Sequence, residues 1–109
     1  MSSVAPLSLL AAVVPLNASM EDWTLLEPLC AASEEARRSF HYAVTFERSF
    51  TSAPIVHVGL VGLDASKEDN LRLSLRTEHI TAAGFVLVVE TWLHTRLWAV
   101  DVSWLAIGH

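Results

Sequence analysis

Apolar and polar side chains alternate with a period of two along most of the chain from residue 39 onward. In the segment SFHYAVTF (39–46) every second residue is large and apolar, namely Phe40, Tyr42, Val44 and Phe46. A period of two places such residues on one face of a β-strand, whereas an amphipathic helix needs a period of 3.6. This segment therefore predicts a strand with one buried face.

Four later segments are also predicted strands, separated by polar or turn-forming residues: IVHVGLVGL (55–63), LRLSLRTEH (71–79), FVLVVETW (85–92) and RLWAVDVSWLAIG (96–108). The first is β-branched and contains glycine, so we expect it to be buried on both faces or closely approached by another backbone. In the second, Leu71, Leu73 and Leu75 should point inward and Arg72 outward. The polar segment 64–70 is expected to be a loop.

Five strands with short connections and no strong helical pattern predict an all-β fold, an antiparallel β-sandwich. A sixth strand is expected from the apolar segment LSLLAAVV (7–14). This segment lacks the basic start of a secretory signal and is too short to span a bilayer, so a strand or packed arm explains it better. The 109 residues form one domain: residues 1–38 as an N-terminal arm with the first strand and loop, and residues 39–109 as the sandwich core.

Composition argues against several function classes. The net charge of −5 disfavours binding to nucleic acid or anionic membrane, and Arg37–Arg38 is an isolated basic pair. A lone cysteine, Cys30, leaves no intrachain disulfide and no cysteine-based zinc site. The histidines have no HxxxH or HExxH spacing, and there is no GxSxG motif or glycine-rich phosphate loop. We therefore expect no metal, no cofactor and no enzymatic activity.

Two residues suggest binding instead. The guanidinium of Arg72 could bind vicinal hydroxyls or a carboxylate, although the pattern alone favours a solvated strand arginine. Trp92 ends a predicted strand beside a polar turn, where its ring could stack on the apolar face of a sugar or pack in the core. Trp104 alternates with Val100 and Val102, which predicts core or subunit interface. Strict alternation puts Trp98 on the same face as Trp104.

Three segments together resemble the H-type lectin domain family, which includes snail agglutinins and the C-terminal domains of slime-mould discoidins: FERSFTSAPIVHVGLVGLD (46–64), NLRLSLRTEHITAAGF (70–85) and TWLHTRLWAVDVSWLAIG (91–108). The shared features are a Phe before a paired turn and Pro, an Asn-x-Arg strand, an Ile-Thr-x-x-Gly-Phe turn, and a Trp-x-x-Thr loop leading to Trp-hydrophobic-Ala. They occur in family order between Phe40 and Gly108. EDWTLL (21–26) resembles an earlier tryptophan segment of the family less specifically.

The resemblance implies a six-stranded antiparallel sandwich that assembles as a homotrimer, sometimes a stacked hexamer. It also implies binding of N-acetylgalactosamine or galactose between neighbouring subunits, with calcium dispensable in some members. The sugar-binding residues carried over from the family are Glu35 (with Glu34 as an alternative), Arg72, Trp92, His94 and Trp98. In this assignment the acidic residue accepts hydrogen bonds from sugar hydroxyls, and Trp98 lies at the rim of the pocket. A twisted strand end or a β-bulge would reconcile this position of Trp98 with the strict alternation.

Some positions depart from the family pattern. Snail proteins place histidine directly after the loop tryptophan, whereas this chain has Leu93, with His94 one position later. The acidic residue is glutamate where the family has aspartate. The sugar preference could therefore differ, and a trimeric oligomerisation or interaction module without sugar binding is the alternative function. Apolar segments 88–92 and 99–102 fit a buried trimer interface, and the compartment stays open between secreted, cell-surface and cytoplasmic.

Overall fold

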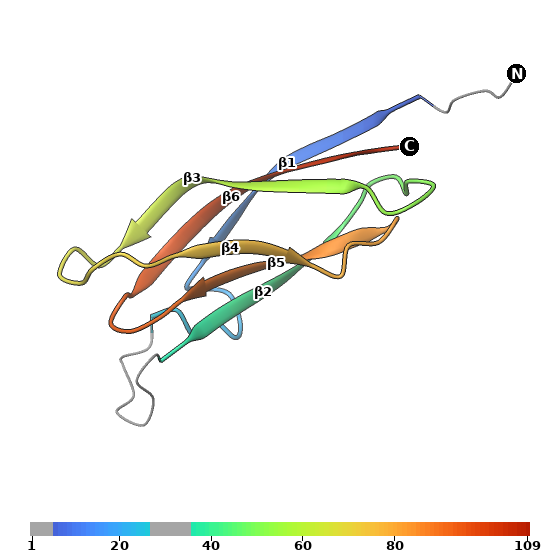
Figure 1. Cartoon of the computed structure of the whole chain (residues 1–109). Helices are drawn as coiled ribbons and strands as arrows, with labels where there is room; N and C mark the ends of the chain where they lie inside the picture. The colour runs from blue at the N-terminus through green and yellow to red at the C-terminus, as the bar shows by residue number, and fades with distance from the viewer. Residues whose placement is uncertain (1–5, 27–35) are drawn as a thin grey trace, which may run out of the picture.

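The computed structural model describes residues 6–26 and 36–109, and every regular element in these ranges is a β-strand. The six strands are β1 (Ser8–Asn17), β2 (Arg38–Thr45), β3 (Ile55–Ala65), β4 (Ser74–Glu78), β5 (Gly84–Thr91) and β6 (Leu97–Gly108). They form two layers in Figure 1. The predicted all-β fold is confirmed, as is the sixth strand from the N-terminal apolar segment.

Each layer is a three-stranded antiparallel sheet. One has the order β1-β6-β3 and the other β2-β5-β4, so β6 and β5 are the central strands. Pro15 is tolerated in β1 because an edge strand does not need every N–H for pairing. The architecture is the antiparallel sandwich expected from the alternation, with the six strands that the family resemblance implies.

The two ends of the sandwich differ. At one end Ser8 pairs with Gly108, so the outer ends of β1 and β6 lie together. At the other end Asn17 pairs with Ala99, and the connections 66–73 and 92–96 lie side by side (Figure 1). We call this second end the loop end, and it carries the predicted binding residues Arg72 and Trp92.

The core is the apolar layer between the sheets. The Trp104 ring centroid lies 5.7 Å from that of Phe46 and 5.5 Å from that of Phe85, which joins the two sheets through aromatic contacts. Fully buried aliphatic residues extend this layer: Leu16, Leu87, Val89, Leu97, Val100 and Val102. Burying each such side chain contributes about 1.5–3 kcal/mol, so this layer supplies the main stabilisation. The prediction of Trp104 as core is confirmed.

The expectation that β3 is buried on both faces is wrong. β3 pairs only with β6, and Ile55 at its start is 77% exposed. Its inward residues Val56 and Val58 are half-buried against the core. β3 is therefore an edge strand whose outer face meets solvent, and it runs to Ala65, two residues into the predicted loop.

The predicted strand over 71–79 begins three residues late, at Ser74, and Leu71 is exposed rather than inward. The carbonyl groups of Asn70 and Arg72 accept hydrogen bonds from the hydroxyls of Thr95 and Thr91. Because side chains satisfy these carbonyls, the segment is held as a loop although its sequence alternates like a strand.

The apolar segments expected at a trimer interface are largely buried inside the chain itself. Val88, Val89, Val100 and Val102 have no exposed surface. Exposed apolar residues lie instead on the outer side of the β1-β6-β3 sheet. We call the following set the apolar face: the exposed Leu9, Val13 and Ile55 together with the half-buried Leu105 and Ile107, of which the register places Leu9 and Ile55 on either side of Ile107.

Two strand glycines provide a test of the packing. A Cβ at Gly84 would collide with the carbonyl oxygen of Val44, whereas a Cβ at Gly59 would meet only the Ser103 hydroxyl at 3.4 Å. We expect Gly84→Ala to lower the free energy of unfolding by about 1–3 kcal/mol, as overpacking does. Gly59→Ala should change it by less than about 0.5 kcal/mol. Urea unfolding of both variants tests this, and equal stabilities would contradict the packing.

Candidate binding site

An ion pair and a backbone hydrogen bond join the two connections at the loop end. Arg96 Nε donates to Asp69 Oδ2 at 2.8 Å, and the Ser66 N–H donates to the Arg96 carbonyl at 3.0 Å. The hydrogen bond from Arg96 lowers the pKa of Asp69 below its ordinary value, and the charge of nearby His94 adds to this. The carboxylate is therefore ionised at neutral pH, and the pair is lost only as the pH falls through the lowered pKa.

Two buried threonines fix the loop that carries Arg72. The Thr91 hydroxyl donates to the Arg72 carbonyl at 2.5 Å, and the Thr95 hydroxyl donates to the Asn70 carbonyl at 2.5 Å. Both threonines are fully buried and no buried side-chain polar atom of the described residues lacks a partner. These bonds hold the 70–72 backbone against the 91–95 segment.

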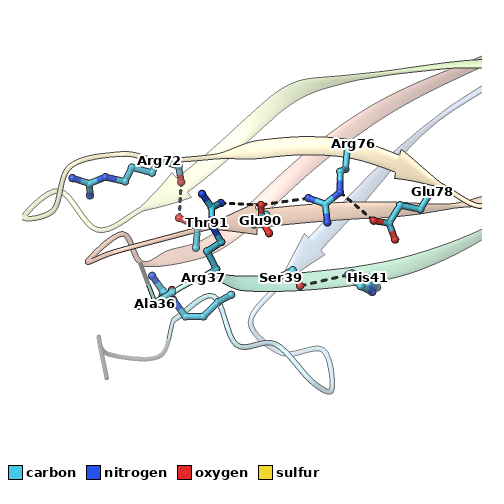
Figure 2. Close-up of polar contacts among 10 residues, drawn as sticks. Ala36, Arg37, Ser39, His41, Arg72, Arg76, Glu78, Glu90 and Thr91 are labelled. Carbon is cyan, nitrogen blue, oxygen red and sulfur yellow. Dashed lines mark hydrogen bonds and ion pairs between the residues drawn. The ribbon is translucent and has the colours of Figure 1, made fainter. Parts of the chain in front are cut away.

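Arg72 is half-buried, and among the described residues its one side-chain hydrogen bond is a long one of 3.5 Å from Nη1 to Thr95 Oγ1. No carboxylate of the described residues lies within ion-pair distance of it. Figure 2 shows its side chain extending away from the ion pairs of Arg76 and Glu78. Because β4 begins only at Ser74, Arg72 is a loop residue rather than a strand arginine, and its guanidinium lies at the loop end.

Trp92 follows β5 directly, and its half-buried ring contacts an arginine that the sequence did not single out. The Arg37 Cζ lies 5.3 Å from the Trp92 ring centroid. Arg37 Nη1 also donates to Glu90 Oε2 at 3.3 Å, and the same carboxylate oxygen accepts from Arg76 Nη1 at 3.4 Å (Figure 2). Ionic contacts on the outer side of the β2-β5-β4 sheet therefore place a cation beside the indole.

The turn after Trp92 is held by Arg38. Leu93 has a φ of 58°, in the left-handed region that non-glycine residues rarely adopt. Its carbonyl accepts from Arg38 Nη2 at 2.7 Å, and Arg38 also donates to the Leu25 and Ala36 carbonyls. This bonding fixes the turn, leaves the Leu93 side chain half-buried and exposes His94.

Trp98 does not share the face of Trp104, and a β-bulge is the reason. Asp64 pairs with Ala99 and Ala65 pairs with Leu97, which leaves Trp98 without a partner in β3. Leu97 stays fully buried while Trp98 is 52% exposed. A bulge reverses the alternation locally, so the prediction from strict alternation that Trp98 shares the face of Trp104 is wrong. The exposed position of Trp98 is compatible with the rim of a binding pocket, which stays a prediction.

The N-terminal connection stabilises this bulge. Trp23 Nε1 donates to the Leu97 carbonyl at 3.0 Å, and the Ala18 N–H donates to the Trp98 carbonyl at 3.0 Å. The Trp23 ring also packs on Phe40, with ring centroids 4.9 Å apart. The segment EDWTLL (21–26) thus positions the start of β6, a role that its apolar pattern alone does not reveal.

The structure brings Arg72 and the Thr91–Thr95 segment together, and it places Trp92 beside Arg37. Trp98 projects from the other sheet, and His94 is exposed near the Arg96–Asp69 pair. Glu35 and its alternative Glu34 lie outside the described residues. The contacts of Arg37, Thr91 and Thr95 at this end were not predicted, because a pattern of alternation carries no signal for bonds between loops.

Other features of the described ranges bear on function. Within residues 6–26 and 36–109, no three His, Cys, Asp or Glu residues cluster so as to hold a metal ion, and no helix is long and apolar enough to cross a membrane. Ser39 Oγ lies 3.4 Å from His41 Nε2 on an exposed face, but no described carboxylate orients the imidazole as a catalytic triad requires.

The fold defines a class: a six-stranded antiparallel β-sandwich domain, here with an arginine and a half-buried tryptophan at its loop end. The profile of the H-type lectin domain matches residues 41–107. The chain belongs to the H-type lectin domain family, as the resemblance in the sequence indicated. Membership of a lectin family points to a binding protein rather than an enzyme.

Similar proteins agree with this assignment. Two structures of discoidin II from Dictyostelium discoideum superpose with TM-scores of 0.76 and 0.74 at 25% identity, over 99% and 98% of this chain. A protein from Fuscovulum blasticum named "ATP synthase subunits region ORF 7" is 42% identical over 71 residues, 65% of this chain. The matched regions span 39% of discoidin II and 62% of the Fuscovulum protein, so these relatives are longer than the shared domain.

The threonine bonds can be tested by removing a hydroxyl without changing side-chain shape. Thr95→Val leaves the Asn70 carbonyl without its donor, so we expect a loss of about 1–2 kcal/mol in the free energy of unfolding. Thr45→Val is the matched control, because this exposed hydroxyl makes no side-chain hydrogen bond. Urea unfolding measures both, and an unchanged Thr95→Val variant would show that the loop does not depend on this bond.

Proposed function

We propose that this protein is a lectin that binds sugars of the galactose and N-acetylgalactosamine type, with Arg72 and Trp92 in the binding site. The observation that carries the proposal is the guanidinium of Arg72, which Thr95 positions at the loop end without a described carboxylate partner. Glu35 or Glu34 is proposed to accept from the sugar hydroxyls, and His94 to lie beside them.

The chemistry of sugars suits this arrangement. A pyranose has an apolar C–H face that stacks on an indole and hydroxyls at its edge that accept from a guanidinium. Hydrogen bonds to charged groups contribute about 1.5–3 kcal/mol each. The half-buried indole of Trp92 and the guanidinium of Arg72 on the adjacent loop provide both kinds of contact, which supports sugar binding at this end of the fold.

We further propose that the protein assembles as a homotrimer, with a stacked hexamer as the higher form. The apolar face supports this, because exposed contiguous apolar surface marks association sites in soluble proteins. Trp98, exposed on the other sheet, could then approach the Arg72 and Trp92 of a neighbouring subunit. Three linked sites would raise the avidity for a surface with several sugars by a factor of about 10² or more.

A trimeric interaction module without sugar binding is the alternative function. Arg37 favours it, because its guanidinium lies over the Trp92 ring and takes surface that a stacked sugar would use. Leu93 favours it as well, since it stands where the snail proteins place a histidine. In this alternative the fold and its assembly are kept, and the loop end binds another partner.

A glycan array with the purified protein tests the sugar site. We expect selective binding of galactose or N-acetylgalactosamine glycans that falls at least about tenfold in Arg72→Ala, because one charged hydrogen-bond donor is lost. Arg48→Ala, which removes an arginine at the opposite end of the sandwich, should bind as the unmodified protein does. Selective binding that persists in Arg72→Ala would place the site elsewhere. A folded trimer that binds no glycan would favour the interaction module.

The assembly is tested by placing charge on the apolar face. Ile55→Glu and Val13→Glu should each dissociate the trimer into monomers, because a carboxylate would be buried without a partner. Ala83→Glu, in an exposed turn of the other sheet, is the matched control. Light scattering coupled to size-exclusion chromatography measures the mass, and trimers in both face variants would exclude this face as the interface.

A further inference from the structure

We propose that the free edge of β1 pairs with the free edge of β1 in a second copy of this chain, antiparallel and about a two-fold axis at Ala11. The contact joins the β1-β6-β3 sheets of two chains into one continuous sheet. It goes beyond the proposed function, because it uses the backbone of an edge strand rather than the loop end. The inference depends on which groups this edge offers, on what leaves it unprotected, and on its symmetry.

Alternate residues of β1 direct their backbone groups out of the sheet. β1 pairs with β6 alone, and beyond its last residue the Ala18 N–H donates to the Trp98 carbonyl. Along an antiparallel ladder, pairs that exchange hydrogen bonds alternate with pairs that do not. The register therefore turns the N–H and C=O groups of Leu9, Ala11 and Val13 away from β6. No strand within residues 6–26 and 36–109 covers this side of β1.

β1 lacks the features that protect the other edge strands. It is ten residues long, and residues 1–20 contain no charged side chain. By contrast, β3 has two bulges, and β4 has only five residues and carries Arg76 and Glu78. The β2 edge is partly covered, because the Thr24 hydroxyl donates to the Ser39 carbonyl at 3.4 Å. Bulges, charges and short length are the usual protection of edge strands, so β1 is open to pairing with a further strand.

The edge suits a second copy because its outward groups are symmetric about Ala11. An antiparallel pair with Ala11 opposite Ala11 of the second copy places Leu9 opposite Val13. Each of these pairs exchanges two backbone hydrogen bonds. Pro15, whose missing N–H would point out of the sheet, falls opposite Leu7 and lies just beyond this ladder. The two-fold register therefore uses every outward donor from Leu9 to Val13 and ends at the proline.

The side chains of β1 favour the same partner. Leu9 and Val13 are 59% and 60% exposed, and the pairing places each beside the other across the two chains, as in stabilising cross-strand pairs. On the inner side a cleft of about 190 Å³ follows the free edge, with Leu10, Ala12 and Trp104 among its lining residues. Leu10 of the second copy, opposite Ala12, would cover it. Two chains of net charge −5 repel each other, and this uncharged segment lets them meet without like charges in contact.

Ala11→Lys tests the pairing, because it places two ammonium groups opposite each other at the two-fold axis. Ala11 is exposed, so the variant should fold. Light scattering coupled to size-exclusion chromatography should give a dimer for the unmodified protein or, together with the proposed trimer, a hexamer. We expect Ala11→Lys to halve this mass at 50 mM NaCl and to recover part of it at 500 mM NaCl, because salt screens the repulsion. Ala43→Lys, exposed on the β2 edge, is the matched control and should keep the mass.

Amide hydrogen exchange, measured by NMR, tests the hydrogen bonds themselves. In the paired protein the N–H groups of Leu9 and Val13 should exchange slowly, because they are bonded to the second chain. In Ala11→Lys at low salt they should exchange fast. The N–H of Ala12 points toward β6 and should stay slow in both proteins, which shows that the variant is folded.

The possible results separate this contact from the proposed trimer. A dimer would support the β1 contact and contradict the trimer, whereas a hexamer would support both. A monomer or a trimer would overturn the β1 contact. An unchanged mass in Ala11→Lys, an equal loss of mass in Ala43→Lys, or fast exchange at Leu9 and Val13 in the unmodified protein would overturn it as well.

Discussion

The rest of the structure depends on the apolar layer between the two sheets. Each sheet has three strands, and no strand of one sheet pairs with a strand of the other, so backbone hydrogen bonds do not join them. Trp104 on β6 contacts Phe85 on β5 and Phe46, and this contact fixes the central strands relative to each other. Because β5 ends at Thr91 and β6 begins at Leu97, the same layer sets the position of the loop end.

At the loop end, hydrogen bonds between side chains and backbone, rather than apolar packing, hold the loops in place. Thr91 and Thr95 satisfy two carbonyls of the 70–72 loop, and Arg38 satisfies the carbonyl of Leu93. Buried carbonyls must find donors, so these few bonds determine the path of two loops. The arginine and the tryptophan at this end thus take their positions from residues that would not themselves touch a ligand.

Sequence alternation predicted the strands and the buried face because both follow from a period of two, and the family motifs pointed to Arg72 and Trp92. Three features could not be predicted from the alternation. The bulge at Trp98 reverses the period by one residue, the loop over 70–73 alternates without pairing, and Arg37 meets Glu90 across 53 positions of sequence. Each depends on contacts between distant segments, which a local pattern cannot contain. The sugar-contact roles of Arg72, Trp92, His94, Trp98 and Glu35 stay predictions.

The pairing of Ser8 with Gly108 determines which way the loop end would face if the protein were attached to a support. The first and last strands meet at the end of the sandwich opposite the loops, so a carrier joined after Gly108 or before Ser8 would leave the loop end directed outward. Many copies anchored to one support in this way would all face the same direction. Their orientation would be common to every copy without any contact between them, and a dense layer of them would present one uniform array of loops.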